Sequence, residues 1–89
     1  RGAMVEPLAV GAHTVSLGEI KKGESVLILG GGPIGAAATI FARQAGAKHV
    51  VVSEPAELRR NRVRELGATA AIDPKTQNVA EAFQAIAGS

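Results

Sequence analysis

The sequence predicts an α/β fold in which helices cover both faces of a parallel sheet. Short apolar runs alternate along the chain with longer segments of helical composition, and turn residues separate them. At residues 25–35 an apolar run leads into a glycine cluster and then into an alanine-rich segment. Such alternation is typical of parallel strands joined by crossover helices. The 89 residues suffice for one small domain, or about one mononucleotide-binding half of a doubly wound sheet.

Three stretches are predicted as strands. Each is short, continuously apolar or rich in β-branched residues, and bounded by turn residues, as expected for strands buried on both faces. They are Ser25–Leu29, His49–Ser53 and Ala70–Ile72.

Four stretches are predicted as helices, because their composition favours helix. They are Ala3–Leu17, Ile34–Gln44, Ala56–Leu66 and Val79–Ala87. The first is expected to start near Pro7 and to lead into a polar connection over Gly18–Gly23. Gly46 and Gly67 are expected to end the second and third helices, and Asn78 is a candidate N-cap for the last.

The glycine cluster fits the dinucleotide-binding pattern G-x-G-x-x-G in one register, with Gly30, Gly32 and Gly35. In such a fold the first glycine allows the tight turn, the second lets a pyrophosphate approach the backbone, and the third lets the helix pack closely on the strand. Pro33 suits the first helical turn, where no N–H is needed. The helix N-terminus offers free N–H groups to phosphates. A tight turn that binds nothing is the alternative for the glycine pattern alone.

An acidic residue, Glu54, follows the second predicted strand, 19 residues after Gly35. A carboxylate there can accept hydrogen bonds from the adenine ribose hydroxyls, which completes a Rossmann-like fingerprint. Its charge would repel a 2′-phosphate, so it favours NAD over NADP. Arg59 and Arg60 argue for NADP, but Glu54 has the closer position. The alternative for Glu54 is an N-terminal charge on the following helix.

Composition and charge exclude several classes of function. The formal net charge is only +2, and the clustered arginines at positions 59–64 are interpreted as a solvated helix face. Nucleic-acid binding is not expected, because the sequence has two phenylalanines and no tyrosine or tryptophan for base stacking. Without cysteine, the chain has no disulfide and no thiolate metal site. No membrane span and no signal peptide are visible, so we expect a cytoplasmic protein.

Five short segments carry a resemblance to a known family. They are Glu6–Val10, Gly30–Gly35, Val52–Pro55, Leu66–Ala68 and Ile72–Pro74. In this order and spacing they resemble the zinc-dependent medium-chain dehydrogenases, above all the polyol branch with sorbitol, threonine and 2,3-butanediol dehydrogenases. Ser53-Glu54-Pro55 is most similar to the butanediol enzymes. The resemblance covers nearly the whole chain but only the middle of such an enzyme.

The resemblance implies a parent oxidoreductase, an alcohol or polyol dehydrogenase that transfers a hydride between a small secondary alcohol or polyol and NAD. Zinc would act in it as a Lewis acid, and the parent would be a homo-oligomer. The backbone around Pro33 and Ile34 would contact the pyrophosphate. Glu54 would bind the ribose and Arg59 would lie beside the adenosine. Glu6 would face the catalytic zinc, as a direct ligand or through water.

The resemblance also implies a division of the chain. Residues 1–24 would be a lead-in helix and linker from the catalytic domain, and residues 25–89 the N-terminal half of the Rossmann domain. The other zinc ligands and the nicotinamide-binding half would lie outside this chain, so we expect no catalysis by these residues alone. His13, seven residues beyond Glu6, is interpreted as a buried core histidine rather than a metal ligand.

Two other functions stay open at this point. A methyltransferase core that binds S-adenosylmethionine also has a glycine turn after its first strand and an acid after its second. Its turn is usually looser than Gly30–Gly35, and it leaves Glu6-Pro7-Leu8 unexplained. The third possibility is a non-catalytic nucleotide-binding module.

Overall fold

The computed structural model describes residues 4–9, 11–12 and 20–88. Within these ranges the chain forms a five-stranded sheet with the order β2-β1-β3-β4-β5. The strands are β1 (Met4–Ala9), β2 (Gly11–Ala12), β3 (Ser25–Leu29), β4 (His49–Ser53) and β5 (Ala70–Ile72). The helices are α1 (Pro33–Gln44), α2 (Glu57–Glu65) and α3 (Val79–Ala87). None of the helices in this described part is long and apolar enough to cross a membrane.

The parallel part of the sheet confirms the predicted α/β fold. β3 pairs in parallel with β4, and β4 pairs in parallel with β5. Leu29 is aligned with Ser53, and Ser53 with Ile72, so the carboxyl ends of the three strands meet at one edge. All three predicted strands have their predicted bounds. The helices after them differ from the prediction by a single residue at some ends, where helix limits are least defined.

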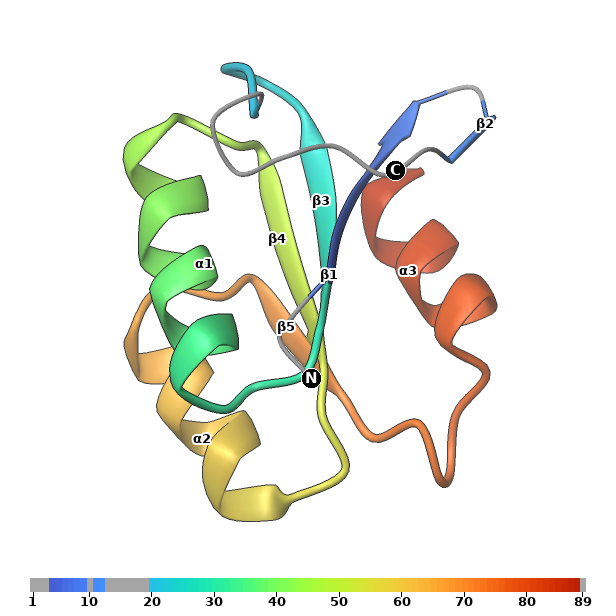
Figure 1. Ribbon diagram of the computed structural model, residues 1–89. Helices are drawn as coiled ribbons and strands as arrows, with labels where there is room; N and C mark the ends of the chain where they lie inside the picture. The colour runs from blue at the N-terminus through green and yellow to red at the C-terminus, as the bar shows by residue number, and fades with distance from the viewer. Residues whose placement is uncertain (1–3, 10, 13–19, 89) are drawn as a thin grey trace.

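Helices cover both faces of the sheet, α1 and α2 on one side and α3 on the other (Figure 1). Alternate side chains of the buried strands point to opposite faces. On the first face the core consists mainly of Val26, Ile28, Ala38, Ala42, Val50, Val52 and Val63. On the second face it consists of Leu27, Val51, Ile72 and Phe83. The core is therefore mostly aliphatic, with Phe83 as its one aromatic member.

The predicted N-cap of α3 is confirmed. Oδ1 of Asn78 accepts a hydrogen bond from the backbone N–H of Glu81 at 2.9 Å. That N–H has no acceptor within the helix, so the side chain satisfies a group that would otherwise bond only to water.

Replacing Asn78 with alanine is therefore expected to lower the free energy of unfolding by about 1 kcal/mol. Urea denaturation followed by circular dichroism measures this loss. Asn78→Ser, which restores an acceptor oxygen, should keep most of the stability. Lys75→Ala, in the exposed loop before the helix, is the control. An equal loss in Asn78→Ser and Asn78→Ala would contradict the capping role.

The predicted helix over Ala3–Leu17 is wrong where the structure describes this segment. Residues 4–9 form β1, which pairs antiparallel with β3 from Met4 opposite Leu29 to Pro7 opposite Val26. Without this pairing β3 would leave a row of unpaired N–H and C=O groups along one side. The hydrogen bonds that residues 4–9 form with β3 therefore outweigh the local preference of this segment for helix. His13 and the rest of residues 13–19 lie outside the described residues.

Candidate functional site

The glycine turn connects β3 to α1 at the carboxyl edge of the parallel strands, where ligands bind in open α/β sheets. Gly30 has φ +102°, a conformation that L side chains rarely adopt. Its N–H donates to the carbonyl of Ser53 at 2.8 Å, which ties the turn to the end of β4. Gly32 is the N-cap of α1, and Pro33 occupies its first turn. The tight turn expected at Gly30 is therefore present.

The two other fingerprint glycines have different surroundings. A methyl group on Gly32 would lie 3.6 Å from Nη1 of Arg59, so the protein itself leaves room for a side chain there. Gly35 is buried in the first turn of α1, and its carbonyl accepts a hydrogen bond from Oγ1 of Thr39 at 2.8 Å. Ile34, between them, is 56% exposed beside the turn.

Glu54 is buried, with 4% of its surface exposed, and it connects three segments. Its Oε1 accepts a hydrogen bond from the N–H of Gly31 at 2.6 Å, and its Oε2 accepts one from the N–H of Ala56 at 2.8 Å. Its own N–H donates to the carbonyl of Ile72 at 2.9 Å. A carboxylate has about four acceptor positions, and these two backbone hydrogen bonds occupy two of them. The bond to Gly31 could not be foreseen from the sequence.

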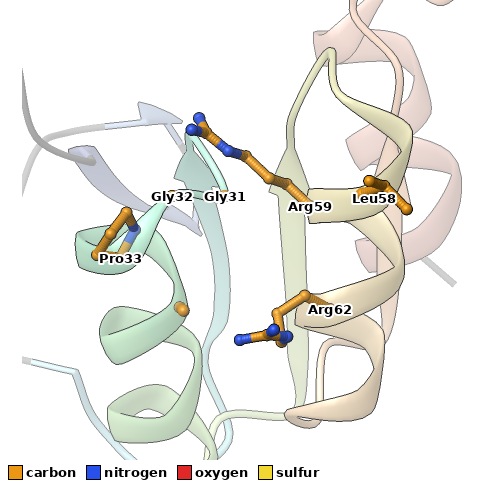
Figure 2. Close-up of a pocket in the computed structure, with 7 residues that line it drawn as sticks. Gly31, Gly32, Pro33, Leu58, Arg59 and Arg62 are labelled. Carbon is orange, nitrogen blue, oxygen red and sulfur yellow. The ribbon is translucent and has the colours of Figure 1, made fainter.

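A pocket of about 410 Å³ opens beside the glycine turn, between α1 and α2 (Figure 2). It is lined by Gly31, Gly32, Pro33, Ala36, Leu58, Arg59 and Arg62. Figure 2 shows Arg59 extending from α2 toward the glycine turn and Arg62 pointing toward α1. Arg62 was missed by the sequence prediction. Its spacing of three residues from Arg59, which places both on one face of a helix, was the available signal.

Arg60, which was considered with Arg59 as a phosphate ligand, is not among the residues that line the pocket. Its Nη1 donates to the carbonyls of Glu54 and Pro55, each at 2.9 Å. The same atom lies 3.7 Å from Oδ2 of Asp73. Arg60 therefore holds the loop after β4 in place.

Arg64 is also engaged within the fold, since it donates to Oδ1 of Asn61 at 2.9 Å and to the carbonyl of Ala71 at 3.4 Å. The side chains of Arg59 and Arg62, in contrast, have no hydrogen-bond or ion-pair partner among the residues that the structure describes. The two pocket arginines are therefore free to bind an anion.

The residues that the structure describes do not make a zinc site by themselves. The described ranges contain no group of three or more His, Asp or Glu side chains that could hold a metal ion. The sequence contains no cysteine. Glu6 lies in β1 opposite Leu27. Because zinc takes about four ligands, three or more of them from protein, a single carboxylate cannot hold it.

The parallel strands with their crossover helices, the glycine turn and the acid after β4 together define one mononucleotide-binding half of a Rossmann-type fold. The family model described as "Zinc-binding dehydrogenase" matches residues 33–89. The chain belongs to the zinc-binding dehydrogenase family.

Relatives of known activity agree with this assignment. Scyllo-inosose 3-dehydrogenase of Thermotoga maritima is 49% identical over 83 residues, which are 91% of this chain and 21% of the relative. (R,R)-butanediol dehydrogenase of Saccharomyces cerevisiae is 46% identical over 65 residues, 73% of this chain and 17% of the relative. These relatives confirm the resemblance to zinc-dependent alcohol and polyol dehydrogenases.

A solved structure gives the same result for the fold. A zinc-binding dehydrogenase from Sinorhizobium meliloti, bound to NADP, is 45% identical with a TM-score of 0.69. The match covers 72% of this chain and 19% of that one. The chain spans about a fifth of the length of the relatives it matches.

Proposed function

We propose that this chain is the adenosine-binding half of the NAD(H)-binding domain of a zinc-dependent oxidoreductase. The parent enzyme would transfer a hydride between a secondary alcohol or polyol and the nicotinamide. The observation that carries the proposal is the glycine turn with Gly32 open toward the pocket and Glu54 bonded to the neighbouring Gly31. The names of the relatives, which are dehydrogenases of scyllo-inosose and butanediol, favour this function over a methyltransferase.

The start of α1 supplies the groups that would bind the pyrophosphate. The first hydrogen bond of the helix runs from the N–H of Ala36 to the carbonyl of Gly32 at 2.7 Å. The N–H groups of Ile34 and Gly35 precede it and have no acceptor within the helix, so they are available to phosphate oxygens. Glu54 would use its remaining acceptor positions for the ribose hydroxyls. NAD, when bound, would supply the hydride acceptor.

Several further assignments are part of this proposal. Arg59 would provide a positive charge beside the adenosine. Glu6 would face a zinc ion whose other ligands come from outside this chain, with residues 1–24 connecting the catalytic domain to the nucleotide-binding residues 25–89. The parent would form a homo-oligomer and act on a small alcohol or polyol. NADP is the second candidate cofactor, because the relative from Sinorhizobium meliloti is bound to it.

Gly32→Ala tests the proposed site. Gly32 has φ −74°, which alanine adopts without strain, and the methyl group would have 3.6 Å to its nearest neighbour. We therefore expect the variant to fold like the wild type. The same methyl group would occupy the space of the pyrophosphate, so NADH should bind at least about tenfold more weakly.

A fluorescence titration with NADH measures the affinity, and urea denaturation of the same samples controls for the fold. Equal NADH affinities of the two proteins would contradict the proposed role of the turn. Binding of S-adenosylmethionine without NADH would favour the methyltransferase. Failure of the folded wild type to bind any of these ligands would overturn the proposal that this half binds a dinucleotide.

A further inference from the structure

We infer that Arg60 is a positioning residue for Glu54. The arginine would hold the backbone of the loop after β4, and through it the carboxylate that faces the glycine turn and the ribose. This inference rests on the proposed dinucleotide site and adds a residue that acts on cofactor binding without touching the cofactor.

The first observation is the attachment of Arg60 to the loop. Its Nη1 donates hydrogen bonds to the carbonyls of Glu54 and Pro55, each at 2.9 Å, and only 15% of its side chain is exposed. Hydrogen bonds from a guanidinium are charge-assisted and stronger than those between neutral groups. Both carbonyls precede Ala56, the N-cap of α2, so the helix itself offers them no donor. Arg60 therefore fixes a piece of backbone that the helix leaves unbonded.

The second observation is how Glu54 is held. Its N–H donates to the carbonyl of Ile72 at 2.9 Å, and its two carboxylate oxygens accept from the N–H groups of Gly31 and Ala56. These three partners are backbone groups, whereas the partner of its carbonyl is the side chain of Arg60. Ala56 lies in the same loop, so a shift of this loop would also move the carboxylate relative to Gly31. The direction of the Glu54 side chain thus depends on the loop that Arg60 holds.

The third observation is an ion pair that orients the arginine. Oδ2 of Asp73, directly after β5, lies 3.7 Å from Nη1 of Arg60. Asp73 is itself held in its turn, because its Oδ1 accepts from the N–H of Lys75 at 3.0 Å and its own N–H donates to Oε1 of Gln77 at 3.2 Å. Arg60 therefore connects the loops after β4 and β5 at the carboxyl edge of the sheet.

Arg60 differs in this respect from the two pocket arginines. Arg59 and Arg62 line the pocket beside the glycine turn, and Arg60 does not. Its effect on cofactor binding would therefore pass through the groups that it holds, of which Glu54 is the one assigned to the cofactor. Residues that act through one another have non-additive effects on binding, whereas independent residues have additive ones in free energy.

The test is a double-mutant cycle on NADH affinity, measured by fluorescence titration of this chain. Arg60→Ala should bind NADH about fivefold to tenfold more weakly than wild type, because the loop and its carboxylate lose their fixed position. Glu54→Gln should lose about tenfold. The double variant should bind NADH within about twofold of Glu54→Gln, because the two changes remove the same contact. Independent residues would instead give a combined loss of about 50-fold to 100-fold.

Arg64→Ala is the matched control, since it removes the same side chain and the same charge from the same helix. Arg64 donates to Oδ1 of Asn61 and to the carbonyl of Ala71, away from residues 54 and 55. Its removal should change the NADH affinity by less than about twofold. Arg60→Lys keeps the charge and a donor, so it should recover part of the affinity that Arg60→Ala loses.

Urea denaturation of the same samples shows whether each variant folds. If Arg60→Ala does not fold, Arg60→Lys takes its place in the cycle, and its smaller loss of about twofold to threefold should vanish in the Glu54→Gln background. Additive losses, or a folded Arg60→Ala that binds NADH like wild type, would overturn the inference and leave the proposed function intact. Equal losses in Arg60→Ala and Arg64→Ala would do the same, because they would indicate a general effect of charge. Failure of the wild type to bind NADH would instead overturn the proposed function, and the inference with it.

Discussion

Replacing Phe83 with alanine is expected to lower the free energy of unfolding by about 3–5 kcal/mol, the usual effect of removing a buried aromatic side chain. Phe83 is 0% exposed and packs against Leu27, Val51 and Ile72. It attaches α3 to one whole face of the sheet. A small domain is stable by only about 5–15 kcal/mol, so the variant should lose a large share of its stability.

Urea denaturation followed by circular dichroism measures this effect, and the chain offers a matched control. Phe41, the other phenylalanine, lies on α1 and is 40% exposed. Phe41→Ala removes the same group with less burial, so it should cost less than about 1.5 kcal/mol. Equal losses in the two variants would show that Phe83 does not anchor α3 as the structure indicates.

The second large effect is expected for Glu54→Gln, which keeps the shape of the side chain but replaces one acceptor oxygen with an NH₂ group. The carboxylate accepts backbone bonds on both oxygens, so one N–H, of Gly31 or Ala56, would lose its acceptor. We expect the free energy of unfolding to fall by about 1–3 kcal/mol. We also expect NADH to bind about tenfold more weakly, because the turn loosens and the ribose loses an acceptor.

Glu57→Gln is the control, since it removes the same charge from an exposed position in the first turn of α2. It should change stability by less than about 1 kcal/mol and leave the NADH affinity near that of wild type. If Glu54→Gln lost affinity at full stability, the carboxylate would serve the ligand alone. If the variant lost stability but bound NADH as tightly as wild type, the carboxylate would only stabilise the turn. Either result would contradict the double role.

The parts of the structure that the sequence predicted correctly depend on residues close together in the chain. The strands over residues 25–29 and 49–53 are largely apolar and have glycine or proline nearby on each side, and the glycine pattern has a single register. These signals depend on neighbours in the chain, so the parallel unit and the turn at Gly30 could be inferred. The N-cap at Asn78 belongs to the same class, because capping is set by residues within one helical turn.

Features that depend on distant parts of the chain were not predictable in this way. Glu54 bonds to Gly31 across 23 positions, and nothing in the local pattern indicates that its oxygens face backbone donors. Which arginines of α2 remain unpaired depends on Asp73 and the carbonyl of Ala71, which lie beyond the helix. The strand over residues 4–9 formed for a similar reason, since its partner β3 begins 16 residues after it ends.

The position of β1 has a consequence for any longer protein that contains this chain. A doubly wound sheet continues beyond its first strand with a parallel strand from its second half. That strand would need the side of β3 that residues 4–9 occupy here. One side of a strand takes one neighbour, so the two pairings compete. Residues 4–9 and a strand from a second half of the sheet would therefore be alternative partners for the same side of β3.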